Sequence, residues 1–146
     1  MWHPESGTKL ILEDPQGRIL ACLRDNDPTI PYPGKWDLPG GGVEPHETLL
    51  ECGHRELFEE FGLQDVPLAM LDQIESRCTP GKIMGRAWGR LTAVQVGSIA
   101  FGPEGQRYDF FSVPEIAELD FVPQLQEYVL TLHGLANRVK LLERTA

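Results

Sequence analysis

The most constraining stretch of the sequence is an acidic segment from Gly40 to Leu63. Glu56, Glu59 and Glu60 are spaced i, i+3 and i+4, so a helix through them places the three carboxylates on one face. Like charges at this spacing repel one another, and the segment contains a single arginine, Arg55, to offset them. Hard divalent cations such as Mg²⁺ prefer carboxylate oxygens and usually bind together with the phosphates of a substrate. The spacing therefore indicates a cation site that serves a phosphorylated ligand.

Composition narrows the classes of partner. The chain has 146 residues and a net charge of −9, from 13 Lys and Arg against 22 Asp and Glu. Such a balance argues against non-specific binding of long nucleic acid or of an anionic membrane, because both attract basic surfaces. It permits a small nucleotide that binds with its metal, since the metal reverses the local charge. The oligomeric state is left open.

Length and cysteine pattern favour one soluble domain over residues 1–146. No apolar run approaches the ~18 residues that a membrane span needs, and the first residues lack the pattern of a secretory signal. Cys22, Cys52 and Cys78 form no CxxC pair. We therefore expect free thiols and a cytoplasmic location.

The hydrophobic pattern predicts alternating strands and helices. The first two strands are separated by the turn Asp14-Pro15-Gln16-Gly17, and residues 36–39 form an extended piece that leads into a glycine loop, Gly40–Gly42. Gly62 is expected to cap the first helix in a left-handed conformation. The predicted elements are strands 8–12, 18–23, 68–74, 87–96 and 107–112, and helices 47–61, 113–119 and 124–143. Helices in the middle and at the end of the chain can cover both faces of one mixed sheet, which predicts an α/β/α sandwich.

The central stretch resembles the Nudix box at every restricted position. Gly41 is followed after five residues by Glu47, and after seven more by Arg55-Glu56-Leu57-Phe58-Glu59-Glu60-Phe61-Gly62-Leu63. The box pattern is G-x5-E-x7-R-E-U-x-E-E-x-G-U, where U is an aliphatic residue, and a chance match at such spacing is very rare. The preceding Trp36-Asp37-Leu38-Pro39-Gly40 is similar to the strand that enters the box in this family. The resemblance implies a Nudix-type α/β/α sandwich.

The resemblance also implies an activity and a set of roles. It implies hydrolysis of a phosphoanhydride bond in a nucleotide or nucleoside diphosphate derivative, with Mg²⁺ or Mn²⁺ as cofactor. Glu56, Glu59 and Glu60 would bind the metal, together with the main-chain carbonyl of Gly40. Glu47 would support the site, and Arg55 would hold the carboxylates by charge-assisted hydrogen bonds.

Two further residues resemble positions that MutT-type members use. Glu104, in Pro103-Glu104-Gly105-Gln106, is a candidate outer metal ligand or general base, although an ordinary turn glutamate is an equally good interpretation. Arg24, at the end of the second predicted strand, is a candidate substrate contact or a solvated surface residue. Trp36 could stack on a base, but a core position is the better interpretation.

Several functions stay open within and beyond this class. MutT-type removal of oxidised nucleoside triphosphates is the first hypothesis, but Gln124 stands where that type uses an asparagine. ADP-ribose, nucleotide sugars, dinucleoside polyphosphates and capped RNA are alternative substrates. A regulator that binds a nucleotide without turnover is a second class, against which the intact box argues. An isopentenyl diphosphate isomerase-like enzyme is a third, but no convincing catalytic cysteine and glutamate pair is present.

Overall fold

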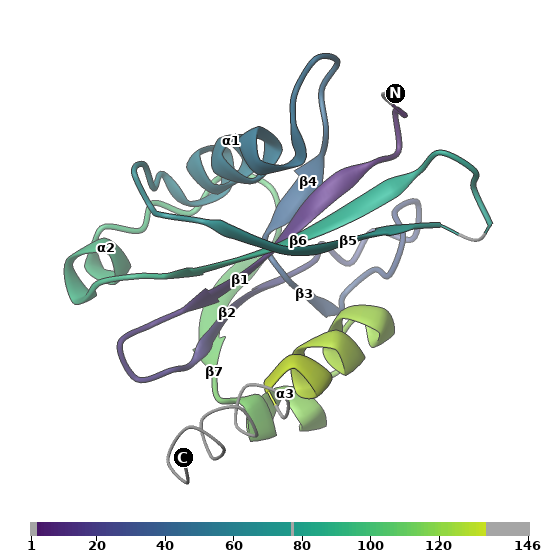
Figure 1. Ribbon diagram of the computed structural model, residues 1–146. Helices are drawn as coiled ribbons and strands as arrows, with labels where there is room; N and C mark the ends of the chain where they lie inside the picture. Colours follow the sequence, from purple (N-terminus) through teal and green to yellow (C-terminus); the bar gives the residue numbers. More distant parts are fainter. Residues whose placement is uncertain (1–2, 77, 134–146) are drawn as a thin grey trace, which may run out of the picture.

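The computed structural model describes residues 3–76 and 78–133, and a mixed β-sheet with helices on both faces forms its centre (Figure 1). A further helical segment covers residues 123–133. The arrangement confirms the predicted α/β sandwich. The labelled elements are β1 (Gly7–Glu13), β2 (Ile19–Leu23), β3 (Trp36–Asp37), β4 (Gly40–Gly42), α1 (Leu49–Phe61), β5 (Ala69–Glu75), β6 (Ile83–Arg90), α2 (Ala93–Gly97), β7 (Arg107–Phe111) and α3 (Val113–Glu118).

Strand β1 builds a core on each face of the sheet, because successive side chains of a strand point to opposite faces. Leu10 and Leu12 pack in the cluster that contains Leu57 and Phe61 of α1. Ile11, between them, packs in the other cluster, with residues of α3 and of segment 123–133 such as Ile116 and Val129. Figure 1 shows α1 on one side of the sheet and α3 on the other.

Local sequence signals set both ends and the position of α1. Thr48 caps the helix, and its hydroxyl accepts from Glu51 N while the Glu51 side chain accepts from Thr48 N, which forms a capping box. Gly62 ends the helix at φ 69° in the left-handed region, as predicted. A Cβ on Gly53 would lie 3.1 Å from Leu10 Cδ2, so this glycine lets α1 approach β1 closely.

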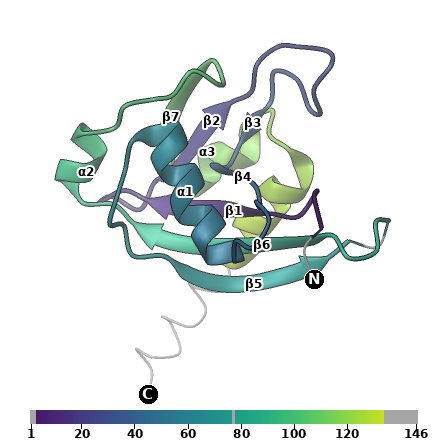
Figure 2. The same ribbon diagram turned by 90° about the horizontal axis from the view of Figure 1, so that it is seen from above.

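The sheet divides between β1 and β2. These strands pair at only one position, Glu13↔Ile19, whereas β1 runs parallel to β6 along its whole length. The first part of β1 pairs instead with β4, and the end of β2 pairs with β3. The link Leu38-Pro39 therefore crosses from one strand to the other, and Figure 2 shows β3 beside β2 and β4 beside β1. This division leaves room for a cleft inside one sheet.

Several predicted elements have different bounds in the structure. The expected strand 87–96 is wrong in its second half, because β6 ends at Arg90 and a capping box at Thr92 starts α2. Residues 40–42 were expected to be a loop but pair with β1 as β4. Helix α1 begins at Leu49 rather than at residue 47, since Thr48 is its cap. The end of the predicted helix 124–143 lies outside the described residues. None of the helices described in residues 3–76 and 78–133 is long and apolar enough to cross a bilayer.

Candidate active site

Two consecutive glycines bring the start of the central segment against β1 and α1. Gly40 has a φ of 134°, and a Cβ there would overlap the carbonyl oxygen of Thr8, so only glycine fits this crossing point. A Cβ on Gly41 would lie 2.5 Å from the carboxyl carbon of Glu56. The Glu56 carboxylate therefore occupies the space that a side chain at Gly41 would need.

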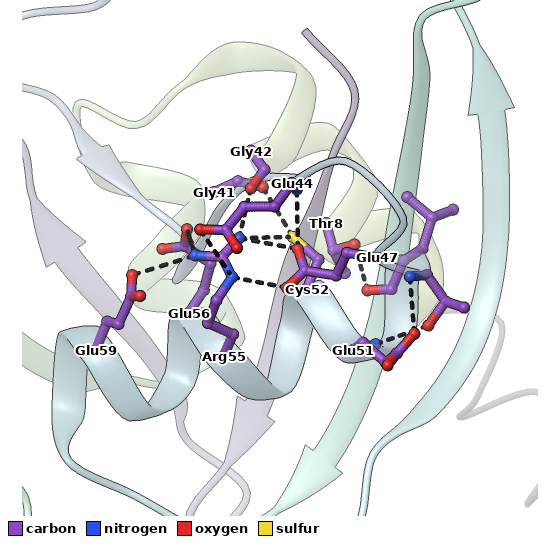
Figure 3. Close-up of polar contacts among 12 residues, drawn as sticks. Thr8, Gly41, Gly42, Glu44, Glu47, Glu51, Cys52, Arg55, Glu56 and Glu59 are labelled. Carbon is purple, nitrogen blue, oxygen red and sulfur yellow. Dashed lines mark hydrogen bonds and ion pairs between the residues drawn. The ribbon is translucent and has the colours of Figure 1, made fainter. Parts of the chain in front are cut away.

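Arg55 is the centre of an ion-pair network on α1 (Figure 3). Its Nε and Nη2 donate to the two carboxylate oxygens of Glu47, at 2.7 and 3.0 Å. Its Nη1 donates to Glu56 Oε1 at 2.9 Å and to Glu59 Oε2 at 3.2 Å. Nη2 also donates to the carbonyl of Gly42 at 2.7 Å. Arg55 also forms an ion pair with Glu44, whose Oε1 lies 3.7 Å from Nε. One guanidinium thus joins two glutamates of α1 to the loop that precedes the helix.

The network changes the protonation equilibria of its members in opposite directions. The hydrogen bonds that Arg55 donates to Glu47 lower the pKa of Glu47, and the same bonds raise the pKa of Arg55. Burial raises the pKa of Glu56, although Arg55 acts in the opposite direction and the neighbouring carboxylates of Glu59 and Glu104 add to the rise. Burial, with a smaller contribution from these carboxylates, therefore outweighs the effect of Arg55 on the pKa of Glu56.

Glu60 lies on the other side of this cluster, toward the divided sheet. Its Oε1 accepts a hydrogen bond from Gly40 N at 2.8 Å. Burial is the main cause that raises the pKa of Glu60 to about 7, and the carboxylates of Glu56 and Asp37 contribute in the same direction. A buried carboxylate next to other carboxylates costs free energy unless a cation joins it.

A cleft of about 360 Å³ opens where β1 and β2 separate. It brings together four residues that the sequence singled out, Arg24, Gly40, Glu60 and Glu104. Its full lining is Lys9, Cys22, Leu23, Arg24, Asp25, Ile30, Asp37, Leu38, Gly40, Glu60, Glu104 and Gly105. The cleft is not lined by Glu47, Arg55, Glu56 or Glu59, which form the adjacent network on α1 and the loop before it.

Two other candidate residues from the sequence, Trp36 and Gln124, lie outside the cleft lining. Trp36 is 7% exposed and packs in the core, edge-on to Phe111. Gln124 exchanges hydrogen bonds with the hydroxyl of Tyr32 and does not line the cleft. Sequence reasoning missed Lys9 and Asp37 as cleft residues. Lys9 stood in an ordinary strand pattern, and no local signal marks it.

The donor set fits a hard divalent cation in its chemistry. Glu56, Glu59, Glu60 and Glu104 supply only oxygen donors, which Mg²⁺ and Mn²⁺ accept readily. These four side chains do not converge closely enough to hold a metal ion as they stand. In the described part of the chain, no group of three or more His, Cys, Asp or Glu residues does. Glu56 and Glu59 are held by Arg55 and Glu60 by Gly40 N, whereas Glu104 makes no hydrogen bond or ion pair with the described residues.

Comparison with known proteins identifies the family. The family model described as NUDIX domain matches residues 3–132. The chain belongs to the Nudix family. The acidic helix, the arginine network and the divided sheet are therefore the Nudix helix and its surroundings.

Named relatives within the family share part of their length with this Nudix chain. An uncharacterised Nudix hydrolase from Yersinia pestis is 35% identical over 112 residues, which cover 74% of this chain and 58% of that protein. The nucleoside triphosphatase NudI from an Enterobacter species is 46% identical over 46 residues, or 32% of each chain. The bovine m7GpppN-mRNA hydrolase NUDT17 is 45% identical over 58 residues, 40% of this chain and 19% of that one. The chain thus matches less than two thirds of the length of these curated relatives.

Solved structures agree on the fold. A mutT/nudix family protein from Listeria innocua superposes with a TM-score of 0.76 at 21% identity, covering 97% of this chain and 99% of that one. An Ap4A hydrolase from C. elegans superposes with a TM-score of 0.69 at 14% identity, covering 90% and 98% of the two chains.

Proposed function

We propose that this protein is a divalent-cation-dependent Nudix hydrolase that cleaves a phosphoanhydride bond in a nucleotide or a nucleoside diphosphate derivative. The observation that carries the proposal is the cleft in the divided sheet, where Glu60 and Glu104 lie together with Arg24. Carboxylates there can hold a metal, and an arginine can hold a phosphate. The complete Nudix box that supplies Glu60 supports turnover rather than binding alone.

The proposed roles follow from what each side chain touches. Glu56, Glu59 and Glu60, with the Gly40 carbonyl, would hold Mg²⁺ or Mn²⁺. When bound, such a cation neutralises the phosphates and lowers the pKa of a water molecule. Phosphoryl transfer otherwise needs mainly positioning and charge stabilisation, which this constellation offers.

Glu104 is the proposed general base. Its carboxylate is exposed in the cleft and makes no hydrogen bond or ion pair with the described residues, so it is free to take a proton from water. Glu59, by contrast, is engaged by Arg55 at 3.2 Å. Arg55 and Glu47 are proposed to position the metal ligands rather than to contact substrate.

The proposed substrate is a small nucleotide. Which nucleotide it is can be determined with a panel of candidate substrates. Relatives named above act on nucleoside triphosphates or on the m7GpppN cap, and a structural neighbour acts on Ap4A. MutT-type specificity for oxidised guanine is the less favoured candidate, because Gln124 bonds to Tyr32 outside the cleft.

The deciding experiment is hydrolysis of a substrate panel with Mg²⁺ and with Mn²⁺. The panel contains nucleoside triphosphates, 8-oxo-dGTP, ADP-ribose, a nucleotide sugar, Ap4A and a capped dinucleotide. Reaction in ¹⁸O-labelled water identifies the phosphorus that is attacked. We expect metal-dependent turnover of at least one compound. Tight nucleotide binding with no turnover of any compound would instead establish the non-catalytic regulator.

A further inference from the structure

The cleft contains two cations that share one buried carboxylate. Asp37 is 4% exposed. Its Oδ2 accepts from Lys9 Nζ at 3.0 Å and from Arg24 Nη1 at 2.9 Å, and its Oδ1 accepts from Leu38 N at 2.7 Å. Lys9 lies on β1 and Asp37 on β3, and Arg24 directly follows β2. Asp37 by itself offsets one of the two positive charges, and Lys9 also acts electrostatically on Glu60.

Both cationic groups are fixed in place. Lys9 Nζ also donates to the carbonyl of Leu38 at 3.3 Å, and Arg24 Nε donates to the carbonyl of Pro31 at 2.8 Å. These contacts use two of the three ammonium hydrogens of Lys9 and leave Nη2 of Arg24 without a partner among the described residues. Lys9 Nζ and Arg24 Nη2 can therefore still donate hydrogen bonds to a ligand, while backbone carbonyls hold both side chains in position.

Lys9 lies beside the proposed reaction centre. It pairs across strands with Gly40, and Gly40 N donates to Glu60. The other charged side chains that line the cleft, apart from Arg24 and Asp37, are the carboxylates of Asp25, Glu60 and Glu104. These would repel a phosphate chain, so Lys9 and Arg24 are the side chains of the lining that can attract one.

We propose that Lys9 is a substrate-binding residue whose ammonium contacts a phosphate oxygen of the nucleotide, and that Asp37 positions Lys9 and Arg24 for this contact. The inference rests on the proposed function and adds a phosphate-binding pair to it. A nucleobase is neutral and cannot neutralise Lys9 or Arg24, whereas a phosphate forms charge-assisted hydrogen bonds with both groups. The alternative is that Lys9 serves only as a counter-ion to Asp37.

Binding of methylenediphosphonate separates these two roles, because this probe carries the phosphate chain without a base and is not hydrolysed. Calorimetry is done in Ca²⁺ with the wild type, Lys9→Met and Lys82→Met, a control in the turn between β5 and β6, outside the cleft. We expect Lys9→Met to weaken binding about 10-fold or more, and Lys82→Met to leave it unchanged. Lys9→Arg should retain most of the affinity. Equal binding by Lys9→Met and wild type, or no binding by wild type, overturns the inference.

Asp37→Asn tests positioning against charge alone. Removing a negative charge from the cleft would strengthen anion binding if the charge alone mattered. If Asp37 positions the two cations, the variant instead binds methylenediphosphonate several-fold more weakly and raises KM more than it lowers kcat. A thermal melt shows whether Asp37→Asn is folded. If it is not, the Lys9 variants still test the proposal. Tighter binding by a folded Asp37→Asn protein contradicts the positioning role.

The two proposals can fail separately. A wild type that hydrolyses a panel compound, alongside a Lys9→Met variant with unchanged kcat/KM, removes the role of Lys9 and leaves the hydrolase. A wild type that hydrolyses nothing, yet binds methylenediphosphonate through Lys9, removes the hydrolase and keeps the phosphate contact.

Discussion

At the scale of single residues, the position of the acidic side chains depends on the space around them as well as on their charge. Gly41 is the first restricted position of the Nudix box, and the structure gives the reason: the Glu56 carboxylate lies where a Cβ would be. Glycine here removes a side chain so that an acid from α1 can approach the loop. The box therefore specifies a packing relation as well as the proposed set of metal ligands.

Gly41→Ala should separate activity from stability. The Cβ would lie 2.5 Å from the end of a flexible glutamate, so Glu56 can move and the free energy of unfolding should fall by only about 1 kcal/mol. Displacement of the carboxylate should lower kcat/KM about 10-fold or more. Gly97→Ala is the control, because its Cβ meets nothing within 4 Å and helix propensity should stabilise it slightly. A Gly41→Ala enzyme with full activity would refute the packing argument.

Glu60→Gln should abolish metal-dependent turnover without harming the fold. The amide oxygen can still accept from Gly40 N, while the variant no longer buries a charge whose burial raises the pKa of Glu60 to about 7. In chelator at pH 8 we therefore expect a melting temperature no lower than that of the wild type. Glu118→Gln, exposed on α3, is the control for both measurements. Retained turnover in Glu60→Gln would remove this residue from the metal site.

At the scale of elements, α1 was predictable and α2 was not. The terminal Gly62 is a local signal that predicted the end of α1 correctly. The capping Thr48 is also a local signal, but the predicted start at residue 47 overlooked it. Helix α2 has only five residues and follows an apolar strand, so periodicity extended the strand through it. Its capping box, Thr92 with Gln95, was the signal that could have corrected this.

Arg55→Met should lower the free energy of unfolding, because Arg55 connects α1 to the loop that precedes it. The variant loses the contacts with Glu47, Glu56 and Gly42 and leaves partly buried carboxylates without a cation, so we expect a loss of roughly 3 kcal/mol in urea unfolding. Arg90→Met is the matched control, because its pair with Glu13 is exposed and worth at most about 1 kcal/mol. An equal loss of unfolding free energy in the two variants would show that the Arg55 network contributes little to stability.

The loop 101–106 carries Glu104 and is tied at both ends. Gly102 N donates to the carbonyl of Glu60 at 2.7 Å, and Gln106 N donates to that of Leu23 at 2.9 Å. Because this holds Glu104 in the cleft, Glu104→Gln should lower kcat roughly 100-fold with little change in KM, as expected for loss of a general base. Steady-state kinetics against Glu118→Gln provide the measurement. An unchanged kcat would make Glu104 a surface residue.

At the scale of the whole molecule, the divided sheet explains what the sequence could not. The Nudix helix was readable because its spacing is local. Lys9 and Asp37 meet only through β1, β2, β3 and β4, whose pairings join residues far apart in sequence. A one-residue change in such a register would turn these side chains to the other face. The proposed substrate side of the cleft thus depends on tertiary pairing, while three of the proposed metal ligands, Glu56, Glu59 and Glu60, lie on one helix.

Metal binding should be visible as stability of the whole molecule. A ligand that binds only the folded state at 100 times its Kd adds about 2.7 kcal/mol, so Mg²⁺ should raise the melting temperature of the wild type. The double variant Glu56→Gln, Glu60→Gln should lose most of this rise, because it lacks two of the proposed carboxylate ligands. Glu118→Gln should keep it, since that side chain lies on α3. The same rise in the double variant would mean that Mg²⁺ acts through general screening of the −9 charge, and the metal assignment on α1 would fall.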